Sequence, residues 1–373
     1  MTNLFAFSTP KQEQGLMAKK FHSNSQLPAD NSNSNSRIAQ PSSEFYSVFS
    51  QEEVLEIIHA LETRWEIPLK YSYKGQGAKI WHNFYQKFLL PKWYRKSNVE
   101  IDLLRDNFEY INSNLQNFSK VNVIDVGAGT SYPAKEFVAR LHQLNKLNKY
   151  VALDISEGLL DVSRKNFTSW FPEIEYNNQQ LDIENSSIPE ICPGNYNLNP
   201  EDTAKIILHM GVTMGNHHNR DKVLKNFRMS MGKNDFLVFT NEIGSNSQWD
   251  GIARGGCKYH AEEIYQAIKN KVGIKSQDCQ LVRKYDLETD SVVANIKFRH
   301  DYTINFSFQG INKQIEIPAG KEITIWRHHK YEMPELLQEI EHAGMQLVHY
   351  TTNKYSSHIM AICKVANDDR TSI

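Results

Sequence analysis

A glycine-rich segment, 125-DVGAGTSYP-133, has the composition of a ligand-binding turn. It follows the apolar run 121-VNVI-124, which predicts a buried parallel strand, and a helix is expected to begin near Ala134. Glycines at a strand-to-helix turn let the backbone approach a ligand, and the helix N-terminus offers unpaired N–H groups. The segment therefore predicts a site for a pyrophosphate or a carboxylate, although the third glycine of the dinucleotide fingerprint is missing.

Acidic residues stand at the ends of the next two expected strands. Asp154 ends the run 149-KYVALD-154, where an acid can accept both hydroxyls of a ribose. Asp182 lies in 181-LDIE-184, where it can accept an adenine amino group while Ile183 packs on the ring. Each feature alone could be a tight turn or a helix cap. Turns and caps do not readily explain why all of them stand at the ends of successive strands. The expected cofactor-binding residues are Asp125, Gly127, Ala128, Gly129, Asp154, Asp182 and Ile183.

Two further segments carry reactive or binding side chains. A fourth strand leads into 209-HMGVTMGN-216, and we expect Asn216 to point into the same pocket. The stretch 324-TIWRHHKY-331 suggests a metal site, a nucleic-acid patch or a pocket wall. The paired histidines of both segments lack the spacing of metal ligands, so no metal is predicted. The 42 Lys+Arg and 43 Asp+Glu nearly cancel, which argues against a nucleic-acid partner and favours a pocket wall.

Alternating strands and helices must position these residues. Strands are expected at 121–126, 149–156, 174–181, 204–210, 235–241, 346–351 and 358–364, and helices at 51–65, 76–89, 98–117, 134–147, 157–166, 220–231, 258–273 and 334–344. This order predicts an open α/β sheet. After Gly244 the alternation breaks, and 291–298, 302–308 and 313–317 have the pattern of antiparallel strands.

The chain divides into four expected parts. Residues 1–43 are polar and repetitive, which predicts a disordered or loosely attached tail, or a weakly bound arm. Residues 44–118 form an N-terminal helical segment, 119–244 with 326–366 the α/β core, and 245–325 an inserted lobe. No run approaches the ~18 apolar residues that span a bilayer, and no secretory pattern is present. With four widely spaced cysteines, these features predict a cytoplasmic protein with no membrane partner.

Several motifs, in order and with near-matching spacing, resemble a known family. It comprises the S-adenosylmethionine (SAM)-dependent histidine Nα-methyltransferases of ergothioneine biosynthesis and the related fungal dimethylallyl-tryptophan N-methyltransferases. The resemblance runs from about Pro68 to Val365. The similar segments are 70-KYSYKGQGAKIW-81, 90-LPKWY-94, 125-DVGAGTS-131, 154-DIS-156, 181-LDI-183, 211-GVTMGN-216 and 319-AGKEITIWRHHKY-331.

The resemblance implies an α/β, Rossmann-like SAM methyltransferase core with N-terminal helices and an inserted α+β substrate lobe. It also implies SAM as cofactor and a small-molecule amine as substrate. In the family, a tyrosine of the aromatic opening and the asparagine of the G-N motif hold the substrate carboxylate and amine. These correspond to Tyr73 and Asn216, the expected catalytic residues. Further substrate contacts are expected from Trp81, Trp93, Trp249, Trp326 and His328.

The late motif departs from the family pattern. Histidine-methylating members place Glu and Ser, spaced as E-x-S, where Trp326 and His328 stand here. An indole in place of a carboxylate cannot accept a hydrogen bond from imidazole. We therefore expect an N-methyltransferase for an aromatic or modified amino-acid derivative of specialised metabolism. A histidine methyltransferase with a rewired pocket, and a SAM-binding regulatory or scaffold protein without turnover, remain as alternatives. The sequence predicts no oligomeric state.

Overall fold

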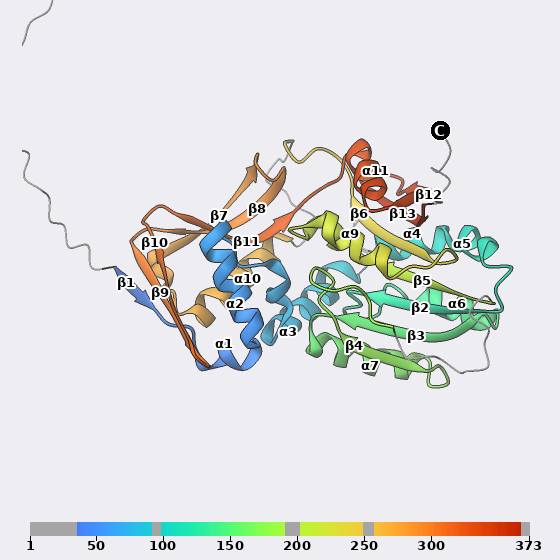
Figure 1. Ribbon diagram of the computed structural model, residues 1–373, viewed down its shortest axis with the longest axis horizontal. Coiled ribbons are helices and arrows are strands. Elements are labelled where there is room, and N and C mark those ends of the chain that lie inside the picture. The colour runs from blue at the N-terminus through green and yellow to red at the C-terminus, as the bar shows by residue number, and fades with distance from the viewer. Residues whose placement is uncertain (1–35, 92–97, 191–201, 249–256, 367–373) are drawn as a thin grey trace, which may run out of the picture. The chain divides into compact units, whose positions relative to one another are not determined.

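The computed structural model describes residues 36–91, 98–190, 202–248 and 257–366, which belong to one compact unit, Ser36–Ile373. Its core is a seven-stranded sheet in the order β12-β13-β6-β5-β2-β3-β4 (Figure 1). The strands are β2 (Lys120–Val126), β3 (Leu147–Asp154), β4 (Tyr176–Gln180), β5 (Thr203–His209), β6 (Phe236–Glu242), β12 (Met345–Thr352) and β13 (His358–Val365). The first five are parallel, and β13 runs antiparallel to both of its neighbours.

The strand order reverses direction between β2 and β5. From β2 the chain adds β3 and β4 on one side, and then β5 and β6 on the other. This is the Rossmann-like arrangement, and ligands bind where the order reverses, outside the carboxyl ends of the strands. The predicted α/β core is therefore confirmed, and its ligand edge is the one that carries the glycine turn.

Helices cover both faces of the core sheet. The core helices are α4 (Val99–Asp106), α5 (Phe108–Asn114), α6 (Lys135–Gln143), α7 (Glu157–Trp170), α8 (Thr213–Asn216), α9 (Arg220–Met229) and α11 (Met333–His342). Side chains of α4, α5, α6 and α7 join one apolar cluster with the sheet. Those of α9 and α11 join a second cluster on the other face. Burial of both faces explains why the parallel strands are almost continuously apolar.

A second region combines the N-terminal helices with the inserted segment. It contains two three-stranded sheets, β1-β9-β10 and β11-β8-β7. Its strands are β1 (Arg37–Ala39), β7 (Cys279–Asp286), β8 (Ser291–Phe298), β9 (Tyr302–Phe308), β10 (Ile311–Ile317) and β11 (Glu322–His328). Its helices are α1 (Ser43–Val48), α2 (Gln51–Arg64), α3 (Gln76–Phe84) and α10 (Cys257–Val272), with the short helices η1 (Leu69–Tyr73), η2 (Tyr85–Leu89) and η4 (Ser276–Asp278). One apolar cluster joins β1, α1, α2, η1, α10 and β7 to β11, and we refer to all of these segments, with α3, η2 and η4, as the lobe.

Two predicted boundaries are corrected by the lobe. Residues 37–43 were assigned to the tail, but β1 pairs in parallel with β9 and Ala39 is buried. The domain boundary at residue 326 cuts through β11, which pairs along its length with β8 of the lobe. The strands 291–298 and 302–308 do form antiparallel pairs, but in different sheets: β8 pairs with β7 and β11, and β9 pairs with β10. None of the described helices is long and apolar enough to cross a membrane.

Candidate active site

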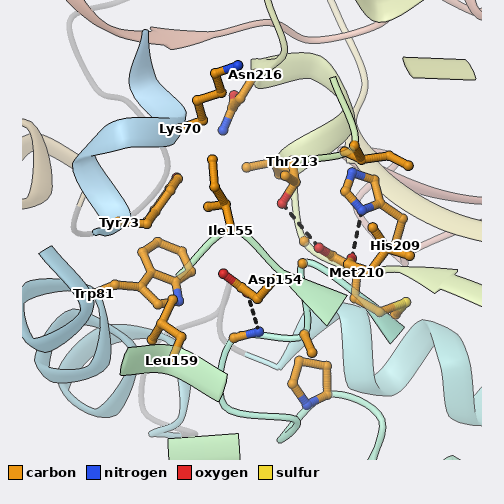
Figure 2. A pocket seen from close by; sticks show the side chains of 18 of the residues that line it. Lys70, Tyr73, Trp81, Asp154, Ile155, Leu159, His209, Met210, Thr213 and Asn216 are labelled. Atoms are coloured by element: carbon orange, nitrogen blue, oxygen red, sulfur yellow. Dashed lines mark hydrogen bonds between the residues drawn. The ribbon is translucent and has the colours of Figure 1, made fainter. Parts of the chain in front are cut away.

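A cavity opens at the carboxyl ends of the parallel strands, and both the core and the lobe line it (Figure 2). The core contributes the glycine turn, the ends of β3 and β5, the residues after β4, and α8. The lobe contributes η1, α3, η2, α10 and β11. The predicted residues among its lining are Tyr73, Trp81, Asp125, Gly127, Ala128, Gly129, Asp154, Asp182, Ile183, Asn216 and Trp326. The fold therefore brings together side chains from distant parts of the chain.

The glycine turn after β2 needs its glycines for conformational reasons. Gly127 has φ +70° and Gly129 has φ +55°, a backbone region that residues with a Cβ rarely adopt. A Cβ on Gly127 would also lie 3.6 Å from the His209 ring, on the cavity side of the turn. The turn is tied to β3 because the Gly129 N–H donates to Asp154 Oδ2 over 2.9 Å. The absence of side chains at Gly127 and Gly129 therefore leaves space beside the backbone on the cavity side of the turn.

Two buried carboxyl groups stand behind this turn. Asp154 Oδ1 accepts from the Ser156 N–H, and burial raises the pKa of Asp154 to about 6. Asp125 Oδ2 accepts from the Tyr150 hydroxyl over 2.6 Å. Burial, reinforced by the charge of Asp154, raises the pKa of Asp125 to about 7. At neutral pH Asp154 is therefore largely ionised and Asp125 is near the midpoint of its titration, and a ligand that donates hydrogen bonds would favour the ionised forms.

The third predicted acid has an ion-pair partner that the sequence analysis missed. Lys70 Nζ donates to Asp182 Oδ2 over 2.7 Å, and the Glu184 N–H donates to Asp182 Oδ1 over 3.0 Å. Lys70 comes from η1 of the lobe and lines the cavity. Its position in 70-KYSY-73, three residues before Tyr73, was the available signal. Contact of Asp182 with an adenine amino group stays a prediction.

Aromatic rings form the lobe side of the cavity. The His260 ring lies 4.9 Å from Phe84, 5.2 Å from Trp81 and 6.3 Å from Tyr73 by ring centroids. His260 is buried, and burial lowers the pKa of its ring to about 4, so that it is neutral. Figure 2 shows Tyr73 and Trp81 on this wall, with Thr213 of α8 across the cavity and Asn216 drawn near Lys70. The sequence analysis identified Tyr73 and Trp81 but missed Phe84 and His260, which no motif marks.

Asn216 ends the short helix α8, which is pressed against the lobe strand. A Cβ on Gly215 would lie 2.3 Å from the His329 carbonyl oxygen, so only glycine allows this close approach. Asn241 also fixes α8, because its Oδ1 accepts from the Gly215 N–H. The Asn216 Oδ1 atom is buried and has no hydrogen-bond partner among the described residues. A buried acceptor without a partner is costly, so this amide is suited to receive a ligand N–H or O–H.

The segment 324-TIWRHHKY-331 contributes one side chain to the cavity lining. Trp326 is 5% exposed and lines the cavity. His328 is not among the lining residues, because its ring turns to the core and its Nε2 lies 2.9 Å from Glu242 Oε2. Its role as a substrate contact stays a prediction. Trp93 and Trp249, also predicted as substrate contacts, lie outside the described residues. No three His, Cys, Asp or Glu side chains of the described ranges are grouped to hold a metal ion.

These features define an α/β methyltransferase site, and sequence comparison gives the family. Residues 51–365 match the family described as histidine-specific, SAM-dependent methyltransferase. Because this match spans most of the chain, the protein belongs to that family. It is a SAM-dependent methyltransferase, and SAM is its methyl donor. No curated protein matches the chain by sequence.

Solved structures with a related fold have low sequence identity. A SAM-dependent methyltransferase from Clostridium acetobutylicum ATCC 824 is 11% identical, with 78% of this chain and 99% of that chain covered and a TM-score of 0.43. PH0226 protein from Pyrococcus horikoshii OT3 is 10% identical, with 76% and 98% covered and a TM-score of 0.42. The CcbJ methyltransferase from Streptomyces caelestis is 12% identical, with 72% and 98% covered and a TM-score of 0.36.

The residues of the cavity fit SAM. The positive-φ glycines leave room beside the backbone of the turn, and Asp154 stands at the end of β3 where a ribose is bound in such sheets. Ile155 and Ile183 add apolar surface to the cavity lining, and packing of Ile183 on an adenine ring stays a prediction. The donor-binding set predicted from the sequence therefore surrounds one cavity.

Proposed function

We propose that this methyltransferase N-methylates a small amine derived from an amino acid, with an aromatic or modified side chain instead of an imidazole. The observation that carries the proposal is the buried Asn216 Oδ1, which has no partner among the described residues and belongs to the lining of the same cavity as Tyr73. An amine N–H satisfies this acceptor, which would otherwise be left desolvated without a hydrogen bond. Tyr73 adds a second polar group to this lining.

Methyl transfer needs positioning and the loss of one proton. Bound SAM supplies a methyl group on a positively charged sulfur, and the nitrogen–carbon bond forms as the carbon–sulfur bond breaks with its electron pair remaining on sulfur. Asn216 and Tyr73 orient the amine lone pair along that line, and orientation accounts for most of the acceleration. An ammonium has no lone pair, so its proton must leave first. Water in the open cavity takes this proton, and the Tyr73 hydroxyl accepts a hydrogen bond from the neutral amine and orients it.

The aromatic wall supports the choice of side chain. Trp326 lies in the cavity lining at the place where the histidine-methylating pattern has its carboxylate. An indole presents a flat apolar face, which stacks on another aromatic ring but cannot accept from an imidazole N–H. Trp81, Phe84 and neutral His260 extend this surface. Together they favour an aromatic group over a polar one.

The test is a turnover screen with labelled SAM. The panel contains L-histidine, L-tryptophan, a prenylated tryptophan and the amines formed by their decarboxylation, and mass spectrometry locates the added methyl group. We expect an indole compound to give the highest kcat/KM and the methyl group to be on its aliphatic nitrogen. If histidine is preferred, the alternative suggested by the family description is correct and our assignment of Trp326 is wrong. SAM binding without a methylated product from any amine would favour a regulatory protein.

A further inference from the structure

A chain of polar contacts links the lobe to the core along the cavity wall, and the proposed function leaves it without a role. Lys70 Nζ lies 2.6 Å from Glu56 Oε1, 2.7 Å from Asp182 Oδ2 and 3.3 Å from Glu184 Oε2. The other carboxylate oxygen, Glu184 Oε1, lies 2.8 Å from His217 Nδ1. Lys70, Glu184 and His217 all line the cavity. One carboxylate therefore joins a lobe side chain to a core side chain.

The hydrogen bonds around His217 define its protonation. His209 Nδ1 lies 2.8 Å from the Val126 carbonyl oxygen, so it donates and its Nε2 is the acceptor. Burial, followed by the charge of His217, lowers the pKa of His209 to about 3, in agreement with a neutral ring. The His217 Nε2 lies 3.3 Å from that acceptor and must donate to it. With His217 Nδ1 beside the Glu184 carboxylate, this geometry assigns hydrogen to both ring nitrogens, which is the charged form of the ring.

The two ends of this chain are next to the two groups that the proposed function assigns to the substrate. Lys70 belongs to the same short helix, η1, as Tyr73. His217 follows Asn216 directly and is the C-cap residue of α8. We propose that Glu184 is a positioning residue that sets the distance between these two elements, with one carboxylate oxygen for each. The assignment of Tyr73 and Asn216 to the substrate rests on the proposed function, whereas the bridge itself does not.

The charges of the bridge depend on one another. Burial disfavours the charged forms of Glu184 and Lys70, but their partners outweigh it. His217 and Lys70 lower the pKa of Glu184 to about 2, and Glu184 with Asp182 raises the pKa of Lys70 to about 12. Removing one member of a buried ion pair leaves an uncompensated charge, which destabilises a protein more than replacing both members by apolar residues. Neutralising Glu184 should therefore release His217 from its charged state and loosen both elements.

The first test measures the protonation of the His217 ring directly, without SAM or substrate. Nitrogen-15 spectra of the histidine rings of the full-length protein at pH 7.5 should contain a doubly protonated ring, which disappears in His217→Gln. In Glu184→Gln this ring should move to the neutral form. Glu56→Gln is the matched control, because it neutralises another carboxylate on Lys70 that does not contact His217, and the ring should stay charged. A neutral His217 in the wild type, or a charged one in Glu184→Gln, would overturn the bridge.

A second test separates the bridge from simple charge. Glu184→Asp keeps the negative charge, so the ring signal should persist, but the shorter side chain cannot contact Lys70 and His217 together. With the best amine of the screen, both Glu184 variants should lower kcat/KM for the amine by about tenfold or more, with the SAM Kd changed by less than about threefold. Equal kcat/KM values for the amine in wild type and Glu184→Asp would refute the positioning role. If no amine is methylated, the proposed function fails, while the ring spectra still decide whether the bridge exists.

Discussion

The proposed donor half and the proposed acceptor half of the cavity are built in different ways. The donor half consists of the ends of neighbouring parallel strands, β2, β3 and the segment after β4, within one sheet. The acceptor half is assembled from η1, α3, α10 and β11 of the lobe together with α8 of the core. Strand neighbours share a hydrogen-bonded register, whereas the acceptor elements are held by side-chain packing and ion pairs.

This difference determines how each half responds to substitution. In the donor half, backbone conformation and a buried carboxylate are required, so few residues can replace Gly129 or Asp154. In the acceptor half, single side chains such as Trp326 line the cavity from a strand whose pairing does not depend on them. Substrate preference can therefore change without loss of the fold or of donor binding.

Asp154→Asn should weaken SAM binding by about 30-fold or more, because a hydrogen bond to a charged group contributes roughly 2 kcal/mol. The same change also weakens the hydrogen bond that the Gly129 N–H donates to the side chain of residue 154. Calorimetric titration with SAM measures the effect. Asp161→Asn on the exposed face of α7 is the matched control and should bind SAM like the wild type. Equal affinity of the two variants would remove Asp154 from the donor site.

Trp326→Glu should shift substrate preference without weakening SAM binding. A carboxylate can accept from an imidazole N–H, so the ratio of kcat/KM for histidine to that for the best indole compound should rise by about tenfold or more. Competition assays with both compounds measure the ratio. Trp326→Phe, which keeps an apolar ring, should leave the preference for an aromatic group in place. An unchanged ratio in Trp326→Glu would show that this residue does not select the side chain.

Gly129→Ala and Gly320→Ala compare the same backbone strain in two places. Both glycines have positive φ, +55° and +82°, so alanine should cost about 1–2 kcal/mol of unfolding free energy at each. Only Gly129 lines the cavity, where its new methyl group would lie 3.5 Å from Trp81 Nε1. SAM affinity should therefore fall by about tenfold in Gly129→Ala alone. Denaturant unfolding and SAM titration separate the two effects, and a similar loss of affinity in Gly320→Ala would contradict the assignment.

The pH dependence of SAM binding should reflect Asp154. Its pKa is raised to about 6 in the free protein, and ribose hydroxyls donate to the ionised form. SAM binding therefore releases a proton below that pH, and affinity should fall by up to about tenfold per pH unit as the pH drops below 6. Above about 7 the affinity should be nearly constant. Asp154→Asn should show no step near pH 6, so a step that persists in this variant would belong to another group.

The core was largely predictable because its pattern is local. The segment 235–241 was predicted as a strand and β6 is Phe236–Glu242, while the predicted helix 51–65 is α2 with its capping box from Ser50 and Glu53. Buried parallel strands are continuous apolar runs, and helix ends have capping signals, so neither requires knowledge of distant residues. The order of strands and glycines was enough to predict the donor edge of the sheet.

The lobe strands show where local patterns stop being informative. β7 has no clear alternation of buried and exposed residues, because it lies at the edge of its sheet. β11 was not predicted, since a bulge between Thr324 and Trp326 interrupts its register and its last residues are polar. Arg327 is buried there beside Glu66, and His328 beside Glu242, which are distant in sequence. A strand rarely buries side chains such as Arg327 and His328. The contacts with Glu66 and Glu242 compensate for this burial, and the local sequence does not reveal them.

The sequence by itself determined the Rossmann-like core, the glycine turn with its acids, and the family with SAM as its donor. These follow from strand–turn–helix units in which neighbouring residues decide the conformation. Only the tertiary structure decided which side chains share the acceptor half. It brought Lys70 and His260 into the cavity lining, kept His328 out of it, and placed Glu184 between Lys70 and His217. Such contacts depend on the packing of the lobe against the core, and no local pattern encodes that packing.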